Sequence, residues 1–409
     1  MAELAADLDF APQTERQRYQ EGWLRDLIRH AYGHAPAARE RIPALDAQLD
    51  QVRVTRKDEL IDLQKASPPF GGFLGVPMRQ VARIFMSPGP LFDPQGLTPD
   101  YWRWGPALRA AGFEADDVVH CAVSFHGTPL GWMFDAALRD LGCTVVPAGV
   151  GATELQVQML RGLRATGFVG TPSALKLLYE KAQELGLDPR GDIALRHAFV
   201  AGEMLPPSLR ADLQSYGPTV CQGYGTADLG CLGYECLERN GMHVPADAFI
   251  ETLDPGTGRP VPVGDLGEVV ATVNERTYPL VRFGTGDLSR LSEAPCPCGR
   301  TAPRLLGIVG RVGEGVKVRG LFVHPRQVDE VVARFPGVAR YRLVVTRSGA
   351  HDELLMEAEC VGDASAEGLA ERLREALRDV TKVRADVALV PVGSIPAGAR
   401  KVEDRRTWD

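Results

Sequence analysis

Three cysteines and one histidine form the clearest candidate ligand set in the sequence. Six residues separate Cys236 from His243, and a gap of 52 residues then leads to Cys296 and Cys298, which flank one proline. Three thiolates and one imidazole are a usual ligand set for tetrahedral zinc, and a zinc ion with four protein ligands is structural and not catalytic. The alternative is that these side chains are buried without a metal.

Four further cysteines lie in segments that predict strands, or at their edges. Eight cysteines in 409 residues are too few for a disulfide scaffold. Residues 1–20 lack a basic region followed by an apolar run, which predicts a cytoplasmic chain whose thiols stay reduced. We therefore expect these four residues to be small core side chains and not nucleophiles: Cys121, Cys143, Cys221 and Cys360.

Composition excludes several classes of protein. The net charge of −7, without a long basic run, disfavours nucleic-acid binding. No run approaches the roughly 18 apolar residues of a membrane-spanning helix, so no membrane association is expected. Hydrophobic residues at 44% and charged residues at 24% are ordinary for a globular chain. At about 150 residues per domain, the length predicts two or three domains.

The middle of the chain alternates between strand and helix patterns. Residues 14–65 have helical spacing, and residues 66–100 are rich in proline and glycine and predict loops. Short β-branched runs then recur between helical segments, which predicts a parallel sheet covered by helices. The expected strands are 117–125, 143–149, 166–170, 197–203 and 219–225.

The character of the sequence changes near residue 231. Residues 231–310 hold short β segments between glycine, proline and aspartate turns, which predicts a smaller β-rich layer or distorted barrel. The last hundred residues follow the order β-α-β-β-α-β, with a last strand at 386–393, and predict a ferredoxin-like lid. The expected fold class is therefore α/β, with a large N-terminal domain, its β-rich part, and a small α+β C-terminal lid.

Seven segments, in order, resemble the phenylacetate–coenzyme A ligases of the adenylate-forming superfamily. They are 171–178, 200–206, 223–230, 234–270, 279–291, 296–311 and 320–332. The resemblance implies an N-terminal domain of residues 1–311 and a mobile C-terminal domain of residues 312–409, hinged near Gly310 and Arg311. It also implies a dimer, since the family often forms dimers.

The resemblance implies a two-step reaction on a small carboxylic acid. The acid attacks the α-phosphate of ATP to give an acyl-adenylate and pyrophosphate, and the thiol of coenzyme A then displaces AMP. The implied cofactors are ATP, Mg²⁺, coenzyme A and a structural Zn²⁺ at the four positions above. The sequence leaves open which acid is activated and whether a carrier-protein thiol replaces coenzyme A.

The resemblance also assigns nucleotide-binding residues. Asp287, after a glycine-rich turn, is implied to accept hydrogen bonds from the ribose, which charge makes stronger. Asp228 takes the place of a glutamate that binds Mg²⁺ in the family, and its shorter side chain reaches less far. The other implied contacts are Tyr224 stacked on adenine, with Gly225 and Thr226 in the same motif, Gly202 and Glu203 on the adenine side, and Arg311. The alternatives are a buried core tyrosine and a turn aspartate.

We expect the acyl pocket at the ends of consecutive predicted strands. Phe125, His126, Gly149 and Gly151, with Trp132 nearby, suit a flat aromatic acid. His126 is either a pocket residue or an ordinary core or surface histidine.

Three departures from the family pattern bear on catalysis. In the expected phosphate loop, residues 85–96, only Ser87 and Gly89 are useful, since Pro88 and Pro90 lack an N–H donor and Asp93 would repel phosphate. At the hinge, Gly313 replaces an acidic residue, and Glu314 follows it. The C-terminal Gly-Lys pair is missing, so that Lys401, or Arg400, would have to serve as the adenylation lysine, unless Lys401 is simply a solvated tail residue.

These departures leave a second hypothesis open. The chain is either a competent ligase or an altered, catalytically impaired homologue that binds nucleotide or acyl-CoA without full ligase activity. A third reading, a plain zinc-binding scaffold, explains the cysteines but not Tyr224, Asp228 or Asp287.

Overall fold

A computed structural model describes residues 8–87, 89–312, 316–319, 321–323, 325–348, 351–361 and 368–407. Pro88, Gly313 and Glu314, which the sequence singled out, lie outside the described residues. The chain divides into two compact units, residues 1–310 and 311–409. No helix of the described residues has the length and apolar character needed to cross a membrane.

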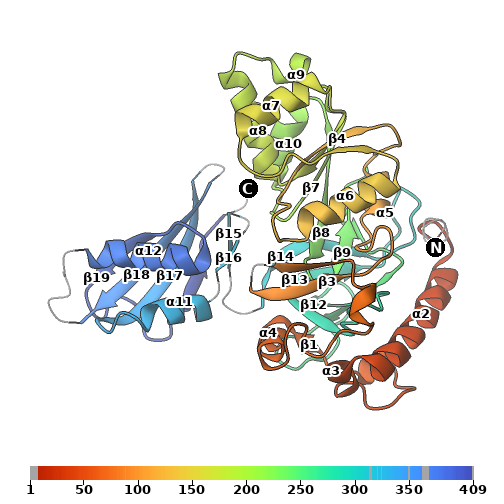
Figure 1. Ribbon diagram of the computed structural model, residues 1–409, viewed down its shortest axis with the longest axis horizontal. Coiled ribbons are helices and arrows are strands. Elements are labelled where there is room, and N and C mark those ends of the chain that lie inside the picture. Colours follow the sequence, from red (N-terminus) through yellow and green to blue (C-terminus); the bar gives the residue numbers. More distant parts are fainter. Residues whose placement is uncertain are drawn as a thin grey trace. The chain divides into compact units, whose positions relative to one another are not determined.

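The parallel strands of the larger unit form where the β-branched runs predicted them. Each of them neighbours another parallel strand, in the order β8-β7-β6-β4-β5. Figure 1 shows α7 to α10 gathered beside this part of the sheet. The strands are β4 (Val118–Ala122), β5 (Thr144–Val146), β6 (Gly167–Gly170), β7 (His197–Ala201) and β8 (Thr219–Thr226). The helices are α5 (Gly105–Ala110), α6 (Leu130–Asp140), α7 (Thr153–Gly162), α8 (Pro172–Glu184), α9 (Pro189–Asp192) and α10 (Pro207–Ser215).

The predicted β-rich segment is present and continues the pairing of the same sheet. A tight β8–β9 turn joins the parallel strands to antiparallel ones. The complete order is β11-β12-β13-β14-β10-β9-β8-β7-β6-β4-β5, with β1 paired to β13. The added strands are β9 (Gly230–Tyr234), β10 (Met242–His243), β11 (Ala248–Leu253), β12 (Leu266–Val273), β13 (Phe283–Ser292) and β14 (Arg304–Arg311).

The N-terminal segment is helical only in part. Helix α2 (Gln13–His34) buries the apolar face that the spacing predicted, including Leu27 and Ile28. Between the short α3 (Pro36–Arg39) and α4 (Lys57–Ala66), however, the chain forms the short helix η1 (Leu49–Gln51) and strand β1 (Thr55–Arg56). Strand β1 pairs in parallel with β13, so this departure from helix ties α4 to the main sheet.

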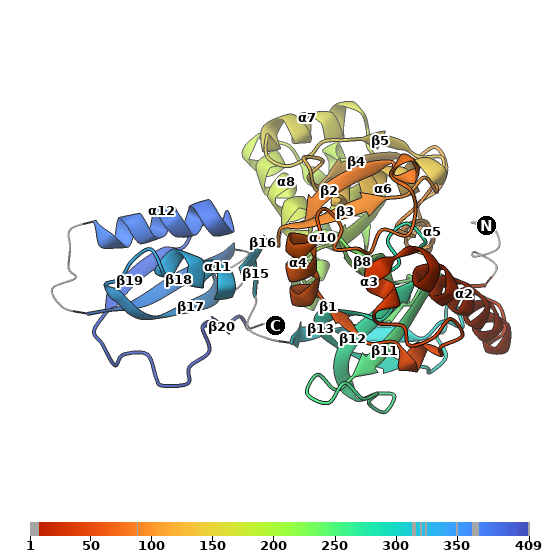
Figure 2. The ribbon, with the colours of Figure 1, turned by 60° about the horizontal axis from the view of Figure 1, so that its bottom comes forward.

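The expected loop at residues 66–100 contains a β-hairpin, which corrects that prediction. After the short helix η2 (Met78–Gln80), β2 (Arg83–Ser87) pairs with β3 (Leu91–Gln95) as a separate two-stranded sheet. Exposed and buried side chains alternate along β2, with Phe85 and Ser87 inside. Figure 2 shows the hairpin in orange beside α4. The proline-rich turn between the strands hid this period-2 pattern in the sequence.

Among its described residues, the smaller unit is an α+β fold of a four-stranded sheet, a two-stranded hairpin and two helices. Its four-stranded sheet has the order β19-β18-β17-β20, and the predicted fold class is confirmed. Two details differ from the expected order. A β15–β16 hairpin replaces the first strand, and it pairs apart from the four-stranded sheet. A further strand, β20, follows the expected last strand and pairs in parallel with β17. The elements are β15 (Val316–Val318), β16 (Leu321–Val323), α11 (Pro325–Val332), β17 (Val338–Ser348), β18 (His351–Cys360), α12 (Leu369–Thr381), β19 (Asp386–Val390) and β20 (Val402–Asp404).

Candidate active site and metal cluster

Tyr224 and Asp287, both implied to bind nucleotide, lie together. The Tyr224 hydroxyl on β8 donates a 2.8 Å hydrogen bond to Oδ2 of Asp287 on β13. Four strand steps of about 4.8 Å each would hold these strands far apart in a flat sheet, so this contact requires the sheet to curl. The Asp287 carboxylate is buried, and its backbone N–H donates to Thr285 Oγ1 at 3.1 Å. A curled sheet therefore brings two distant motifs to one place.

Gly225 and Thr226 fix the turn that follows Tyr224. A Cβ on Gly225 would lie 2.3 Å from the Gly230 carbonyl oxygen and 2.8 Å from the Trp104 ring, so only glycine fits there. The Thr226 hydroxyl accepts a hydrogen bond from the Leu229 N–H at 3.1 Å. Both residues hold the backbone that carries Asp228.

Asp228 is paired with a lysine that the sequence analysis did not single out. The Lys57 ammonium lies 2.8 Å from Asp228 Oδ2; the Asp228 side chain is 0% exposed and that of Lys57 19%. Lys57 is the first residue of α4, and 171 positions separate it from Asp228. No local pattern marks a pair so distant in sequence, and the β1–β13 pairing together with the Gln64 hydrogen bonds to Phe92 and Tyr278 holds α4 at this place.

Asp93 of the hairpin interacts electrostatically with this pair. Burial raises the pKa of Asp93 well above its usual range, the Asp228 charge raises it further, and the Lys57 charge opposes both. Hydrogen bonding from Ser87 also lowers the pKa of Asp93, and Oδ1 of Asp228 is buried without a hydrogen-bond partner among the described residues. The sequence predicted that Asp93 repels phosphate; the structure buries its side chain on β3, where the charges of Asp228 and Lys57 act on its pKa.

Gly202 and Glu203 follow β7, at the carboxyl end of the parallel strands where ligands bind in open α/β sheets. Gly202 adopts a φ of +85°, which favours glycine. Glu203 Oε2 accepts a 3.3 Å hydrogen bond from the Ser173 N–H in the first turn of α8. The pair therefore follows β7 as the sequence predicted, and the Glu203 carboxylate accepts its hydrogen bond from protein backbone.

The expected acyl-pocket residues form an open aromatic corner. The rings of Phe125 and Trp132 meet edge to face with centroids 5.6 Å apart, and Trp132 Nε1 donates to the Phe125 carbonyl at 3.1 Å. His126 is exposed. The carbonyls of Gly149 and Gly151 accept from the Gln156 side chain, and no atom lies within 4 Å of a Cβ added at either glycine.

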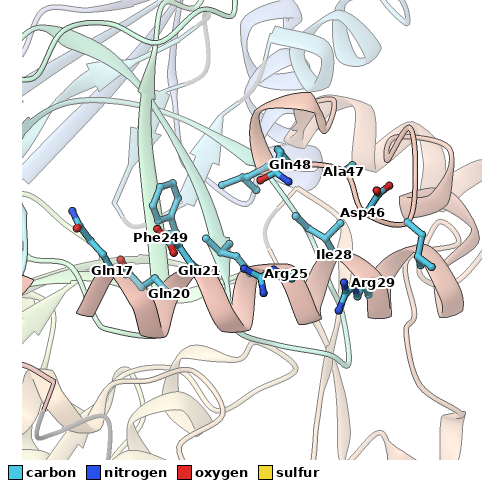
Figure 3. Close-up of a pocket in the computed structure, with 13 residues that line it drawn as sticks. Gln17, Gln20, Glu21, Arg25, Ile28, Arg29, Asp46, Ala47, Gln48 and Phe249 are labelled. Atoms are coloured by element: carbon cyan, nitrogen blue, oxygen red, sulfur yellow. The ribbon is translucent and has the colours of Figure 1, made fainter. Parts of the chain in front are cut away.

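A pocket of about 650 Å³ lies elsewhere, along α2. Figure 3 shows Gln17, Glu21 and Arg25 of α2 on one side of it and Phe249 of β11 behind them. Residues 45–49 close its far end. None of the predicted acyl, nucleotide or metal residues lines it.

Cys236, His243, Cys296 and Cys298 converge, with their potential ligand atoms all within 4.8 Å of one another. The Cys236 and Cys296 sulfurs are 3.9 Å apart, and Cys298 Sγ lies 3.4 Å from His243 Nε2. Cys236 follows β9, His243 is in β10, and the other two follow β13. The strand pairing thus assembles a compact Cys₃His cluster.

The electrostatics of the cluster favour a neutral imidazole. Burial lowers the pKa of His243 to about 4, and the Arg300 charge adds to this effect. Burial also raises the pKa of Cys236. For Cys298, burial acts in the same direction, but the Arg300 backbone N–H and the neighbouring thiols outweigh it and lower the pKa. A neutral imidazole beside thiols is the protonation state from which a metal ligand set forms.

The other cysteines are core residues, with one exception. Cys121, Cys143 and Cys221 are buried, as predicted, whereas Cys360 at the end of β18 is only half-buried. The sequence interpretation omitted Cys231, which is buried in β9.

The residues implied at the domain junction and in the tail lie in or beside the smaller unit. Arg311 ends β14. Lys401 directly precedes β20, and its ammonium contacts both carboxylate oxygens of Asp329 at 2.7 and 2.9 Å and lies 5.6 Å from the Tyr341 ring centroid. Arg400 is exposed. Lys401 is therefore an exposed side chain that forms an ion pair with Asp329.

Comparisons with known proteins agree with this architecture. Residues 100–273 match the family model described as AMP-binding enzyme, and residues 320–406 match the AMP-binding enzyme C-terminal domain. The chain is 30% identical to the phenylacetate-coenzyme A ligase of Thermus thermophilus, over 95% of this chain and 96% of the relative. It is also 30% identical to that of Escherichia coli, over 96% and 95%.

A solved structure extends this similarity to three dimensions. A 2-hydroxyisobutyryl-CoA ligase, crystallised with its acyl-AMP and coenzyme A, has a TM-score of 0.88 and 30% identity. The match covers 97% of this chain and 91% of that one. With its fold, its motifs and its relatives in agreement over nearly the whole length, the chain belongs to the phenylacetate–coenzyme A ligase family of adenylate-forming enzymes.

Proposed function

We propose that this protein is an AMP-forming acid–thiol ligase, which activates a carboxylic acid with ATP and transfers the acyl group to coenzyme A. The observation that carries the proposal is the Tyr224–Asp287 hydrogen bond, because it joins the two implied nucleoside contacts in one site. A buried carboxylate at this position can accept bonds from both ribose hydroxyls. Full-length matches to named coenzyme A ligases support the reaction class.

Mg²⁺ is part of the proposed reaction and fits the residues present. Carboxylate oxygens are its preferred ligands, usually with substrate phosphates, and Oδ1 of Asp228 is buried without a hydrogen-bond partner among the described residues. Asp228 would hold the ion. When bound, Mg²⁺ neutralises charge on the phosphates.

An aromatic acid is the substrate class that we propose. Phe125 and Trp132 supply two aromatic side chains in edge-to-face contact, with the Arg83 guanidinium 4.6 Å from the Trp132 ring centroid, and a Cβ at Gly149 or Gly151 would meet no atom within 4 Å. His126, Gly202, Glu203 and Arg311 complete the proposed contacts. Lys401 is proposed as the adenylation lysine, which requires that it leave Asp329.

We also propose a structural Zn²⁺ at the Cys₃His cluster and mobility of the smaller domain about Gly310 and Arg311. The donor set and its spacing within 4.8 Å support zinc. Metal analysis of protein purified without added metal should find about one zinc per chain, and Cys296→Ser should abolish it. Zinc-free wild-type protein with full thermal stability would contradict this part of the proposal.

The ligase activity is tested with ATP, coenzyme A and a panel of aryl acids, by acyl-CoA formation and by acyl-hydroxamate capture. Product with at least one acid, together with AMP release, is expected. No product with any acid, alongside intact ATP, would overturn the proposal.

The changed sequence of the β2–β3 hairpin favours a second candidate function. In it, the protein is an altered homologue that binds AMP or acyl-CoA but not ATP. The acidic Asp93 stands where the family binds phosphate. Calorimetry separates the two candidates, since ATP binding with Mg²⁺ supports the ligase, whereas AMP or acyl-CoA binding without ATP binding supports the altered homologue.

A further inference from the structure

The N-terminal segment, residues 9–11, is attached to the loop that carries two of the proposed zinc ligands. The Thr301 N–H donates to the Asp9 carbonyl at 2.9 Å, and the Thr301 hydroxyl donates to the Ala11 carbonyl at 2.6 Å. Thr301 follows Cys298 by three residues, whereas 290 positions separate it from Ala11. A segment remote in sequence is therefore fixed directly beside the metal cluster.

Asp9 adds two side-chain contacts to this attachment. Its side chain is 7% exposed, and Oδ2 accepts from the Tyr234 hydroxyl at 2.9 Å and from Arg300 Nε at 3.4 Å. Phe10 holds the same arginine, since the guanidinium carbon lies 4.8 Å from its ring centroid. A buried carboxylate is stable only when it is paired and hydrogen-bonded, so Asp9 and these partners depend on one another.

Arg300 connects Asp9 to a proposed zinc ligand. The Arg300 backbone N–H donates to Cys298 Sγ at 3.5 Å, and such a bond is stronger when the sulfur is charged, as it is when it binds a metal. The Arg300 side chain is 13% exposed. Because Asp9 and Phe10 hold that side chain, they also fix the backbone whose N–H meets the sulfur.

Tyr234 connects Asp9 to two strands of the sheet. Tyr234 lies on β9, where it pairs with His243 of β10 on one side and with Gly223 of β8 on the other. His243 is a proposed zinc ligand, and Gly223 directly precedes Tyr224 of the nucleoside site. The Asp9 carboxylate therefore contacts the strand that lies between the metal cluster and the nucleoside site.

We propose that Asp9 is a positioning residue of the metal site, which holds Arg300 and Tyr234 so that the N-terminal segment and a zinc ion stabilise each other. The inference rests on the zinc proposed at the Cys₃His cluster. Because coupling between two binding events is reciprocal, a segment that tightens zinc binding must itself be held more tightly when zinc is bound. Hydrogen-bonded partners of metal ligands commonly change metal affinity by about 10–100-fold.

The test measures zinc affinity and the order of the segment, and not turnover. Wild type, Asp9→Asn and Asp26→Asn compete for zinc with a chromophoric chelator, and hydrogen exchange of residues 8–20 is compared with and without zinc. Asp26 is an exposed residue of α2 and controls for the loss of one negative charge. Circular dichroism and thermal unfolding verify that each variant is folded.

Asp9→Asn should weaken zinc binding by about tenfold, whereas Asp26→Asn should bind as the wild type does. Zinc should slow hydrogen exchange of residues 8–20 in the wild type and have little effect on it in Asp9→Asn. Thr301→Val removes the hydroxyl bond to Ala11 without a change of charge, so it should weaken zinc binding by a smaller factor and serves as the test if Asp9→Asn does not fold.

Equal zinc affinity in the wild type and in a folded Asp9→Asn would overturn the role of Asp9 and leave the proposed zinc site standing. Unchanged affinity in Thr301→Val would do the same if Asp9→Asn does not fold. Equal weakening in Asp26→Asn would reduce the effect to general charge and also overturn the inference. Wild-type protein that binds no zinc would overturn both the inference and the zinc site.

Discussion

The two ends of the proposed nucleotide site are built in different ways. The nucleoside end uses strands of the main sheet, with Tyr224 on β8 and Asp287 on β13 joined by a direct hydrogen bond. The phosphate end uses peripheral elements, namely α4 and the separate β2–β3 hairpin. Strands inside the main sheet are fixed by backbone hydrogen bonds to a neighbour on each side. A separate two-stranded hairpin has fewer such bonds and can change in length and sequence. Two departures from the family pattern, residues 85–96 and Asp228, belong to the second end, whereas Gly313 and the missing Gly-Lys pair belong to the C-terminal part of the sequence.

The largest expected effect comes from a substitution that disrupts the nucleoside end. Asp287→Ala should lower kcat/KM for ATP by about 100-fold or more, because hydrogen bonds to a charged group contribute about 1.5–3 kcal/mol each and this carboxylate can accept two from ribose. Steady-state kinetics of acyl-CoA formation provide the measurement. Asp265→Ala, at an exposed position before β12, is the control and should keep wild-type kinetics. An Asp287→Ala variant with nearly wild-type kcat/KM would show that Asp287 does not bind the nucleotide.

The next effect breaks the ion pair at the phosphate end. Lys57→Met leaves the Asp228 carboxylate buried without its partner, and loss of one partner from a fully buried pair costs about 3–5 kcal/mol. Since the Lys57 side chain is 19% exposed, the loss of unfolding free energy in chemical denaturation should fall below that range. Lys65→Met, at an exposed position of the same helix, should change little. The Lys57→Met/Asp228→Asn double variant should recover much of the loss, and a double variant as unstable as the single one would argue against the pair.

A smaller effect refines the nucleoside end. Tyr224→Phe keeps the ring that is proposed to stack on adenine but removes the hydroxyl that orients Asp287, so KM for ATP should rise by about tenfold, in line with 1–2 kcal/mol for one such bond. KM for the acid should stay unchanged. An equal rise in both KM values would indicate a general disturbance of the site and not a nucleotide contact.

The smallest expected effect concerns Asp100, which holds the backbone at Trp104, the residue whose ring lies next to Gly225. Asp100 accepts hydrogen bonds from the N–H groups of Trp104 and Gly105, and burial raises its pKa to about 6. A carboxyl whose folded pKa lies above its unfolded value near 3.9 destabilises the fold progressively as pH rises through that interval and no further above it. The melting temperature of wild type relative to Asp100→Asn should therefore fall between pH 4 and pH 6 and then level off. A difference that stays constant over this interval would contradict the raised pKa.

Sequence reasoning succeeded where the chemistry is local. The β-branched runs marked β4 to β8 because strands buried on both faces read as continuous apolar segments, and the Cys₃His set was recognisable from residue type and spacing. The pairing of Tyr224 with Asp287 was implied by resemblance alone, since the sheet curl that joins them is a property of the whole fold.

Sequence reasoning failed where the contact is distant or the element is short. Lys57 could not be linked to Asp228 across 171 positions, and the two-residue strand β1 that brings it there has no detectable period. The hairpin was assigned to a loop because Pro88 and Pro90 obscured the alternation on either side. Asp93 was recognised as unusual, but its partners depend on the register of that hairpin.

Calorimetric titration of wild-type protein with AMP and with ATP, each with and without Mg²⁺, tests the account most directly. A nucleoside end made by Tyr224 and Asp287 should bind AMP in the absence of the metal. A phosphate end at which Asp228 would hold Mg²⁺ should bind ATP tightly only when Mg²⁺ is present. No AMP binding, or ATP binding of equal strength in a metal chelator, would contradict the account.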